Sequence, residues 1–156
     1  MAKKIKLTAT LPNGEVIDRT TARTYTHVVV YMINEAKMMA ACWTPQNEKQ
    51  ERQNFVYYAQ CAAGEHDHAR VHEGAPEWKA SSAATCRKNG EDMMAEFPTV
   101  EAFVAGRKAR SEYHARKQID IGWHIAGWCG RPDLAQKLAA SGCHYAAGEI
   151  KIIEVN

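Results

Sequence analysis

Residues 24–33 constrain the fold of this chain more than any other stretch, because they are apolar at both alternating positions. The stretch includes three consecutive valines, Val28–Val30, and continues through a tyrosine, a methionine and an isoleucine. Side chains along a strand point alternately to the two faces of a sheet, so apolar residues at both positions are typical of a central strand covered on both sides. Three β-branched residues in a row also favour a strand over a helix. We therefore predict that Val28–Val30 lie buried in the middle of a sheet.

Two further strands are predicted before this one. Residues 3–11 alternate between apolar and polar side chains, as a strand with one buried face does. Pro12, Asn13 and Gly14 suit a hairpin turn, because proline presets φ while asparagine and glycine tolerate a positive φ. Residues 15–19 return as the second strand. Together with the central strand they predict a three-stranded antiparallel meander.

The middle of the chain is predicted to be helical. Residues 34–43 contain good helix formers and predict a short helix. Thr44 is a candidate N-cap, and Pro45 suits the first position of a second helix. That helix is predicted to end at Gly64, since glycine is the residue most common just beyond a helix.

Two more helices are predicted farther along. One covers residues 76–88 and is ended by Asn89 and Gly90, because asparagine and glycine are typical of helix ends. The other covers residues 100–117, with Thr99 as its N-cap.

The last third of the chain predicts a β-α-β unit. A strand pattern runs over residues 119–126, a helix opens near Pro132 and is closed by Gly142, and residues 149–155 form the final strand. Such a unit usually places its two strands in a parallel pair. The predicted fold is therefore α+β: a single domain over residues 1–156, with a mixed, mostly antiparallel sheet of about five strands, the terminal β-α-β unit and two longer helices packed on the sheet.

Composition and charge narrow the class of protein. With 46% hydrophobic and 24% charged residues, the chain resembles a soluble globular domain, and no apolar run approaches the ~20 residues that span a bilayer. The N-terminus alternates polar and apolar residues, unlike a secretory signal.

The five cysteines include no C-x-x-C pair, which argues against a disulfide framework and for small buried side chains in a reducing compartment. A net charge of +2 is too small to require a nucleic-acid or membrane partner. We expect a cytoplasmic protein with no membrane partner.

The densest chemical cluster in the sequence is a polar stretch that contains His66, His68 and His72. On an extended chain the three imidazoles share one face, whereas on a helix only the last two do. Neutral imidazoles bind divalent transition metals, and a neighbouring carboxylate can complete the shell. The spacing matches no specific metal motif, so we predict a solvated loop and no cofactor. A structural zinc at residues 66–72 is the alternative hypothesis.

The second long helix carries the most concentrated positive charge. Its candidate partner-binding residues are Arg107, Lys108, Arg110, His114 and Lys117. All but Lys108 recur at three- or four-residue spacing, near one line of the helix. Such a line suits an anionic partner, either a phosphate backbone or an acidic protein surface. The alternative is a solvated helix face whose charge complements the C-terminal helix dipole.

Two strand histidines and a tyrosine are candidate catalytic residues. If the strands that contain His27 and His124 are neighbours, the two imidazoles lie close together, with Tyr58 near them. Imidazole titrates near neutral pH and can act as a general acid or base beside a phenol. No nucleophile elbow, phosphate-binding loop or metalloprotease motif accompanies them. The alternative is that each histidine is bonded to a backbone or hydroxyl group and has a structural role.

These observations predict a small intracellular, non-enzymatic binding protein. It is expected to dock on a macromolecule, either a protein or a nucleic acid, through the basic helix, as accessory or inhibitory proteins of phages and mobile elements do. The alternative hypothesis is a small enzyme that uses His27, His124 and Tyr58, or a metal held at residues 66–72.

Overall fold

The computed structural model describes residues 3–67 and 77–156 of an α+β chain. Contacts between residues divide the chain into two compact units. The first unit consists of Met1–Cys42 and His114–Asn156, and the second of Trp43–Tyr113. Helix α5 (Val100–Asp120) begins in the second unit and ends in the first. In the described part of the chain, no helix combines the length and the apolar character that crossing a membrane requires.

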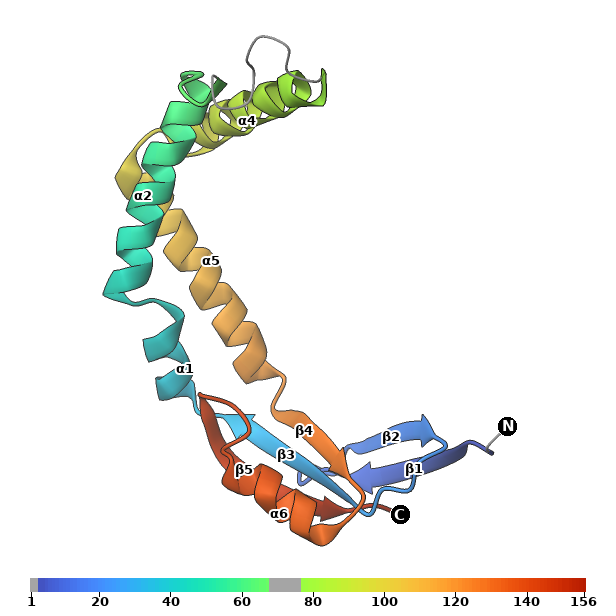
Figure 1. Ribbon diagram of the computed structural model, residues 1–156. Coiled ribbons are helices and arrows are strands. Elements are labelled where there is room, and N and C mark those ends of the chain that lie inside the picture. The colour runs from blue at the N-terminus through green and yellow to red at the C-terminus, as the bar shows by residue number, and fades with distance from the viewer. Residues whose placement is uncertain (1–2, 68–76) are drawn as a thin grey trace. The chain divides into compact units, whose positions relative to one another are not determined.

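The first unit is organised around strand β3 (His27–Ile33), as the sequence predicts. β3 is the middle strand of an antiparallel sheet in the order β4-β3-β5, with β4 at Trp123–Cys129 and β5 at Ala147–Glu154 (Figure 1). Val28, Val29 and Val30 are 0% exposed. The prediction that Val28–Val30 are buried in a central strand is confirmed.

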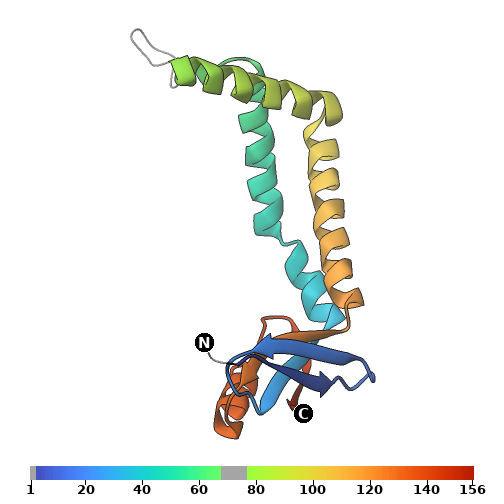
Figure 2. The same cartoon turned by 90° about the vertical axis from the view of Figure 1, so that its right-hand side faces the viewer.

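The two faces of this sheet are covered by different elements. Strands β1 (Ile5–Thr10) and β2 (Val16–Thr21) form an antiparallel hairpin, whose Ala9 packs with Val28 and Val30 (Figure 2, blue). On the opposite face, helix α6 (Pro132–Ala140) packs on Val29. Because the hairpin covers one face and α6 the other, both alternating positions of β3 are removed from water.

The predicted single sheet of about five strands is wrong, because the strands form one two-stranded and one three-stranded sheet. The predicted meander fails because β2 does not pair with β3. Instead the hairpin packs over the sheet, and the backbone of Thr8 exchanges hydrogen bonds of 3.2 and 2.9 Å with Asn156 at the end of the chain.

The predicted parallel pair at the C-terminal end is also wrong. β4 and β5 are each antiparallel to β3, so they run in the same direction, but β3 lies between them. This is a split β-α-β arrangement, with α6 as the crossover. The buried central strand needs a hydrogen-bonded neighbour on each edge, and β4 and β5 provide the two neighbours.

The first unit also contains helix α1 (Glu35–Cys42), where the sequence predicts a short helix. Its Met38 packs with Ala115 of α5 and with Ala146. The predicted strand from residue 119 begins later than expected. Ile119 is still helical and packs beside Met38, and the strand begins at Trp123, after Gly122 turns the chain with a φ of 80°.

The second unit contains helix α2 (Pro45–Ala62), which begins at the predicted cap. The Thr44 side chain accepts a hydrogen bond from the backbone of Asn47, and the Asn47 side chain accepts one from the backbone of Thr44. This reciprocal capping box satisfies two donors at the start of the helix. Gly64, just beyond the helix, has the positive φ of 75° that the sequence predicts for a helix end.

Helix α4 (Glu77–Glu96) packs across α2 in the second unit (Figure 1). The prediction that a helix ends at Asn89 and Gly90 is wrong, because α4 continues through both. Gly90 is buried against α2, where a Cβ atom would lie 2.5 Å from the carbonyl oxygen of Tyr58. The glycine therefore permits a close helix contact and does not mark a chain reversal.

Helix α5 begins at the predicted Thr99 cap, whose hydroxyl accepts a hydrogen bond of 3.2 Å from the backbone of Ala102. One turn into the helix, Phe103 is 0% exposed. Its ring lies 5.6, 6.0 and 5.7 Å, between centroids, from three aromatic rings of the second unit, those of Phe55, Tyr58 and Phe97. This aromatic cluster joins α5 to α2.

Candidate functional site

The predicted basic line on α5 begins inside the packing of the second unit. Arg107 follows Phe103 by one turn, and its guanidinium carbon lies 4.9 Å from the Phe103 ring centroid. Its Nε lies 3.6 Å from a carboxylate oxygen of Glu51 on α2, and its side chain is 23% exposed. That buried Nε makes no hydrogen bond to the described residues. Arg107 therefore contributes to the contact between α5 and α2.

Two other cations of α5 have acidic neighbours. The ammonium of Lys108 lies 3.9 Å from the carboxylate of Glu112, one turn along the same helix. Arg116 forms an ion pair with Glu35 at the start of α1. Both pairs are exposed, and exposed pairs of this kind contribute little to stability.

The remaining predicted residues on α5 form what we call the cationic face: Arg110, His114 and Lys117. All three side chains are exposed, and their three- and four-residue spacing places them on one side of the helix. Arg110 makes no ion pair with the side chains of residues 3–67 and 82–156, in contrast to Arg107 and Lys108. The cationic face therefore includes an arginine whose charge is not offset within the described chain.

The structure does not bring the candidate catalytic residues His27 and His124 together. His27 is opposite Cys129 of β4, whereas His124 is opposite Tyr31 of β3. His27 and Tyr31 are four residues apart on β3, which corresponds to about 13 Å along a strand. The third candidate, Tyr58, belongs to the second unit.

Each of these histidines has a local hydrogen bond. Nδ1 of His27 shares a bond of 2.8 Å with the hydroxyl of Thr26, the preceding residue. Nε2 of His124 donates to the carbonyl oxygen of Gln118, 2.8 Å away. These bonds to a hydroxyl and to a backbone carbonyl are of the kind expected if the two histidines have a structural role and not a catalytic one.

His124 is instead part of a stack of three rings in the first unit. Its imidazole lies 5.3 Å from the ring of Tyr31 at an angle of 18°, and His144 lies 5.7 Å from the same ring at 13°. Burial raises the pKa of Tyr31, and the neighbouring Cys143 raises it further. Both effects favour the protonated phenol. Sequence reasoning missed Tyr31 and His144, because residues 113 positions apart come together only through the pairing of β3 and the turn before β5.

Of the three candidate metal ligands, only His66 lies within the described residues; His68 and His72 lie outside them. Nε2 of His66 is 3.2 Å from the side-chain oxygen of Gln60, and its ring lies 4.9 Å from the ring of Tyr57. No group of three or more His, Cys, Asp or Glu side chains suited to a metal occurs in the described part of the chain. The metal hypothesis therefore depends on residues whose positions are not described.

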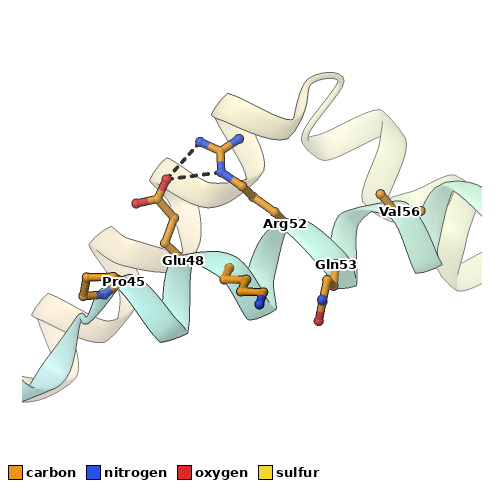
Figure 3. Close-up of a pocket in the computed structure, with 6 residues that line it drawn as sticks. Pro45, Glu48, Arg52, Gln53 and Val56 are labelled. Atoms are coloured by element: carbon orange, nitrogen blue, oxygen red, sulfur yellow. Dashed lines mark hydrogen bonds and ion pairs between the residues drawn. The ribbon is translucent and has the colours of Figure 1, made fainter.

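Two hollows occur on the second unit. The larger, about 500 Å³, is lined entirely by one side of α2, from Pro45 to Val56 (Figure 3). Arg52 and Glu48 within it already bond to one another, at 2.9 Å. The smaller, about 230 Å³, lies between α2 and α4, where Tyr58 faces Asp92 and Glu96. Neither has the convergent polar groups on an enclosed apolar surface that small-molecule sites have.

Of the predicted site residues, the exposed Arg110, His114 and Lys117 thus lie along one side of α5, and Arg107 packs on Phe103. No protein-family model, curated protein or solved structure matches this chain.

Proposed function

We propose that this protein is a non-enzymatic binding protein that docks on an anionic macromolecular surface through the cationic face of α5. The observation that carries the proposal is the exposed Arg110, which has no acidic partner among the side chains of residues 3–67 and 82–156. A guanidinium forms paired hydrogen bonds with a carboxylate or a phosphate, so an arginine without an internal partner is suited to an external one. His114 and Lys117 add donors on the same side of the helix.

The proposal gives the basic residues of α5 different roles. Arg107 contacts Phe103 and Glu51 and supports the helix packing, so it is not part of the proposed docking surface. Lys108 is exposed but has Glu112 beside it, so its contribution to docking is expected to be smaller. The docking proposal therefore concerns Arg110, His114 and Lys117 first, and Lys108 second.

The anionic partner is either a nucleic acid or an acidic protein surface, as an accessory or inhibitory protein would bind. The two differ in their response to salt. Neutralising phosphates releases condensed counterions, so the logarithm of the nucleic-acid affinity falls steeply and linearly with the logarithm of the salt concentration. A protein partner held by a few ion pairs loses affinity more gradually.

The test is capture from the native cell at low salt, with both proteins and nucleic acids identified. The double variant Arg110→Glu/Lys117→Glu is expected to lose the captured partner. Its matched control is Lys4→Glu/Arg23→Glu, which makes the same change in net charge at two exposed positions outside α5. The proposal fails if the α5 variant retains every interaction, or if the control loses them equally.

The enzyme alternative receives less support from the geometry. It requires His27 and His124 to act together, and the pairing of β3 with β4 places them at separate positions of the ladder. The metal alternative is tested by metal analysis of protein purified without a histidine tag. Less than stoichiometric zinc would remove it.

A further inference from the structure

Two cysteines of the second unit meet across the packing of α2 and α4. The Sγ atom of Cys61 on α2 lies 2.9 Å from the Sγ atom of Cys86 on α4. Even carbon atoms, which are smaller than sulfur, stay about 3.5–4.0 Å apart when they are not bonded. None of the five cysteines forms a disulfide in the structure, so this is a contact between two thiols.

The helix packing explains why these two side chains meet. Gly90 lies one turn beyond Cys86 on α4, and a Cβ atom at Gly90 would be 2.9 Å from the Cβ atom of Cys61. Residues four apart lie on the same side of a helix, so Cys86 and Gly90 both face α2. The absence of a side chain at Gly90 lets the two helices approach closely, and the two sulfur atoms are held together by backbone packing.

The two thiols differ in access to solvent. Cys61 is 2% exposed, whereas Cys86 is half-buried. The hydroxyl of Tyr57 lies 3.9 Å from the Sγ atom of Cys86. Hydrogen bonding to Cys61 and then to Cys86 raises the pKa of Tyr57, so its phenol remains a donor when a thiolate forms. One thiol is thus accessible to a reagent, and the other is enclosed beside it.

We propose that Cys61 and Cys86 form a reversible disulfide, which makes this helix pair a redox-responsive modification site. The oxidant is a low-molecular-weight disulfide such as oxidised glutathione. In the first step the Cys86 thiolate attacks one sulfur of that disulfide, which forms a mixed disulfide and releases one thiolate. In the second step the Cys61 thiolate attacks the Cys86 sulfur, which forms the Cys61–Cys86 bond and releases the second thiolate.

The reaction balances without any further reagent. The two protein thiols lose two protons and two electrons, and the small disulfide takes them up as two thiols. A reduced dithiol reverses the reaction by the same exchange. The enclosed position of Cys61 favours the second step over a lasting mixed disulfide, because its sulfur is already in contact with that of Cys86.

The bond also closes a loop between residues 61 and 86. A disulfide limits the conformations of the unfolded chain, so the cross-linked protein is expected to unfold at a higher temperature. The expected rise in the midpoint is about 5–10 °C for a loop of this length. This inference is independent of the docking proposal, because neither cysteine belongs to the cationic face.

The experiment incubates the folded full chain in glutathione buffers of increasing oxidised fraction. The remaining thiols are then alkylated. The mass of the protein is measured by mass spectrometry, both intact and after digestion with trypsin. We expect the loss of two alkylation sites and a cross-link between the tryptic peptides 53–70 and 80–87, each of which contains one cysteine. Cys86→Ser and Cys61→Ser are each expected to remove the cross-link and the rise in unfolding midpoint.

Cys42→Ser is the matched control, because Cys42 is also half-buried and its Sγ donates to the carbonyl of Met39, a bond that a serine can replace. This variant is expected to form the cross-link as the unaltered protein does. Three outcomes would overturn the proposal: no loss of thiols, glutathione retained on Cys86 as a mixed disulfide, or cross-links distributed among all the cysteines. The test remains decisive even if either serine variant unfolds. In that case the presence or absence of the Cys61–Cys86 cross-link in the unaltered chain and in Cys42→Ser decides it.

Discussion

Gly90 of α4 lies against the carbonyl oxygen of Tyr58 in α2, so closely that a Cβ atom at position 90 would be 2.5 Å from that oxygen. The same atom would be 2.5 Å from the backbone nitrogen of Ala62. Both neighbours are backbone atoms of a helix and cannot rotate away, as the end of a long side chain can. The approach of α4 to α2 therefore depends on the absence of a side chain at this position.

The substitution Gly90→Ala is expected to destabilise the second unit. Alanine is the better helix former by about 1 kcal/mol, but the clash with α2 costs more than this gain. We expect a net loss of about 1–3 kcal/mol, in the range for side chains forced into a packed interior. Urea unfolding followed by far-ultraviolet circular dichroism measures the loss.

The control for this substitution is Asn89→Ala, at the neighbouring exposed position of α4. It gains helix propensity without entering the contact with α2, so unfolding is expected to be unchanged or slightly harder. An increase in stability for Gly90→Ala as large as that for Asn89→Ala would contradict the contact.

Gly90 also illustrates what the sequence does not reveal about the fold. Local rules associate a glycine after an asparagine with a helix end, and the same residue serves equally for close packing against a second helix. Only the position of α2 distinguishes the two uses. Where the signal is local, as at the Thr44 cap or the turn at Gly14, prediction and structure agree.

The apolar pattern of β3 also predicts the local structure but not the packing partners. The apolar character of Val28–Val30 at both alternating positions correctly predicts a central strand, because burial on both faces affects every side chain of the segment. It does not identify the neighbours. In the structure, residues 123–129 and 147–154 pair with the two edges of β3. Nothing in the sequence of these two strands distinguishes this arrangement from one in which they pair with each other.

The substitution Val29→Ala is expected to lower the free energy of unfolding of the first unit by about 2 kcal/mol, because it leaves a cavity between β3 and α6. Val29 is 0% exposed and packs with Ala135 of α6. The matched control is Val16→Ala in β2, where the valine is 61% exposed and the expected change is below about 0.5 kcal/mol. Urea unfolding compares the two. Equal effects would show that β3 is not the core strand.

The candidate site was less predictable than the fold. Spacing on a helix places Arg110, His114 and Lys117 on one side, but it cannot show that Arg107, on the same line, lies over Phe103. The pair Cys61 and Cys86 has no local signal, since 25 residues separate the two and only the crossing of α2 and α4 brings them into contact.

The substitution Arg107→Ala is expected to destabilise the second unit by about 1 kcal/mol, through loss of the contact with Phe103 and of the packing of its methylene groups. Lys108→Ala, one position along, removes only an exposed ion pair and is expected to change stability by less than about 0.5 kcal/mol. The reverse order of the two effects, measured by urea unfolding, would show that Arg107 projects from α5 as a docking residue instead.

The last prediction concerns alkaline pH and depends on Tyr31. Burial, and then the neighbouring Cys143, raise the pKa of Tyr31 above its ordinary value of 10.0. Burial also raises the pKa values of the Cys129 and Cys143 thiols above 9.0. In each case the folded chain retains a proton that the unfolded chain releases, so ionisation favours unfolding. These groups leave stability unchanged below their ordinary pKa values, and they lower it as the pH rises through the folded-state values.

The free energy of unfolding is therefore expected to decline first above pH 9.0, as the two thiols ionise in the unfolded chain, and more steeply above pH 10.0, when Tyr31 joins them. Tyr31→Phe is expected to make the decline above pH 10.0 shallower, because phenylalanine keeps the ring between His124 and His144 and has no proton to lose. The earlier decline from the thiols remains, as does the contribution of Tyr57, whose pKa is raised by its hydrogen bonds to Cys61 and Cys86. Tyr113→Phe, at a tyrosine that is 55% exposed, is expected to leave the whole profile as it is. Two measurements check this prediction. Urea unfolding at a series of pH values gives the stability profile. The tyrosinate absorbance of the unaltered chain minus that of Tyr31→Phe gives the titration of Tyr31 in the folded chain. If that difference titrates at or below pH 10.0, burial and Cys143 do not raise the pKa of Tyr31 in the folded chain, and the prediction is wrong.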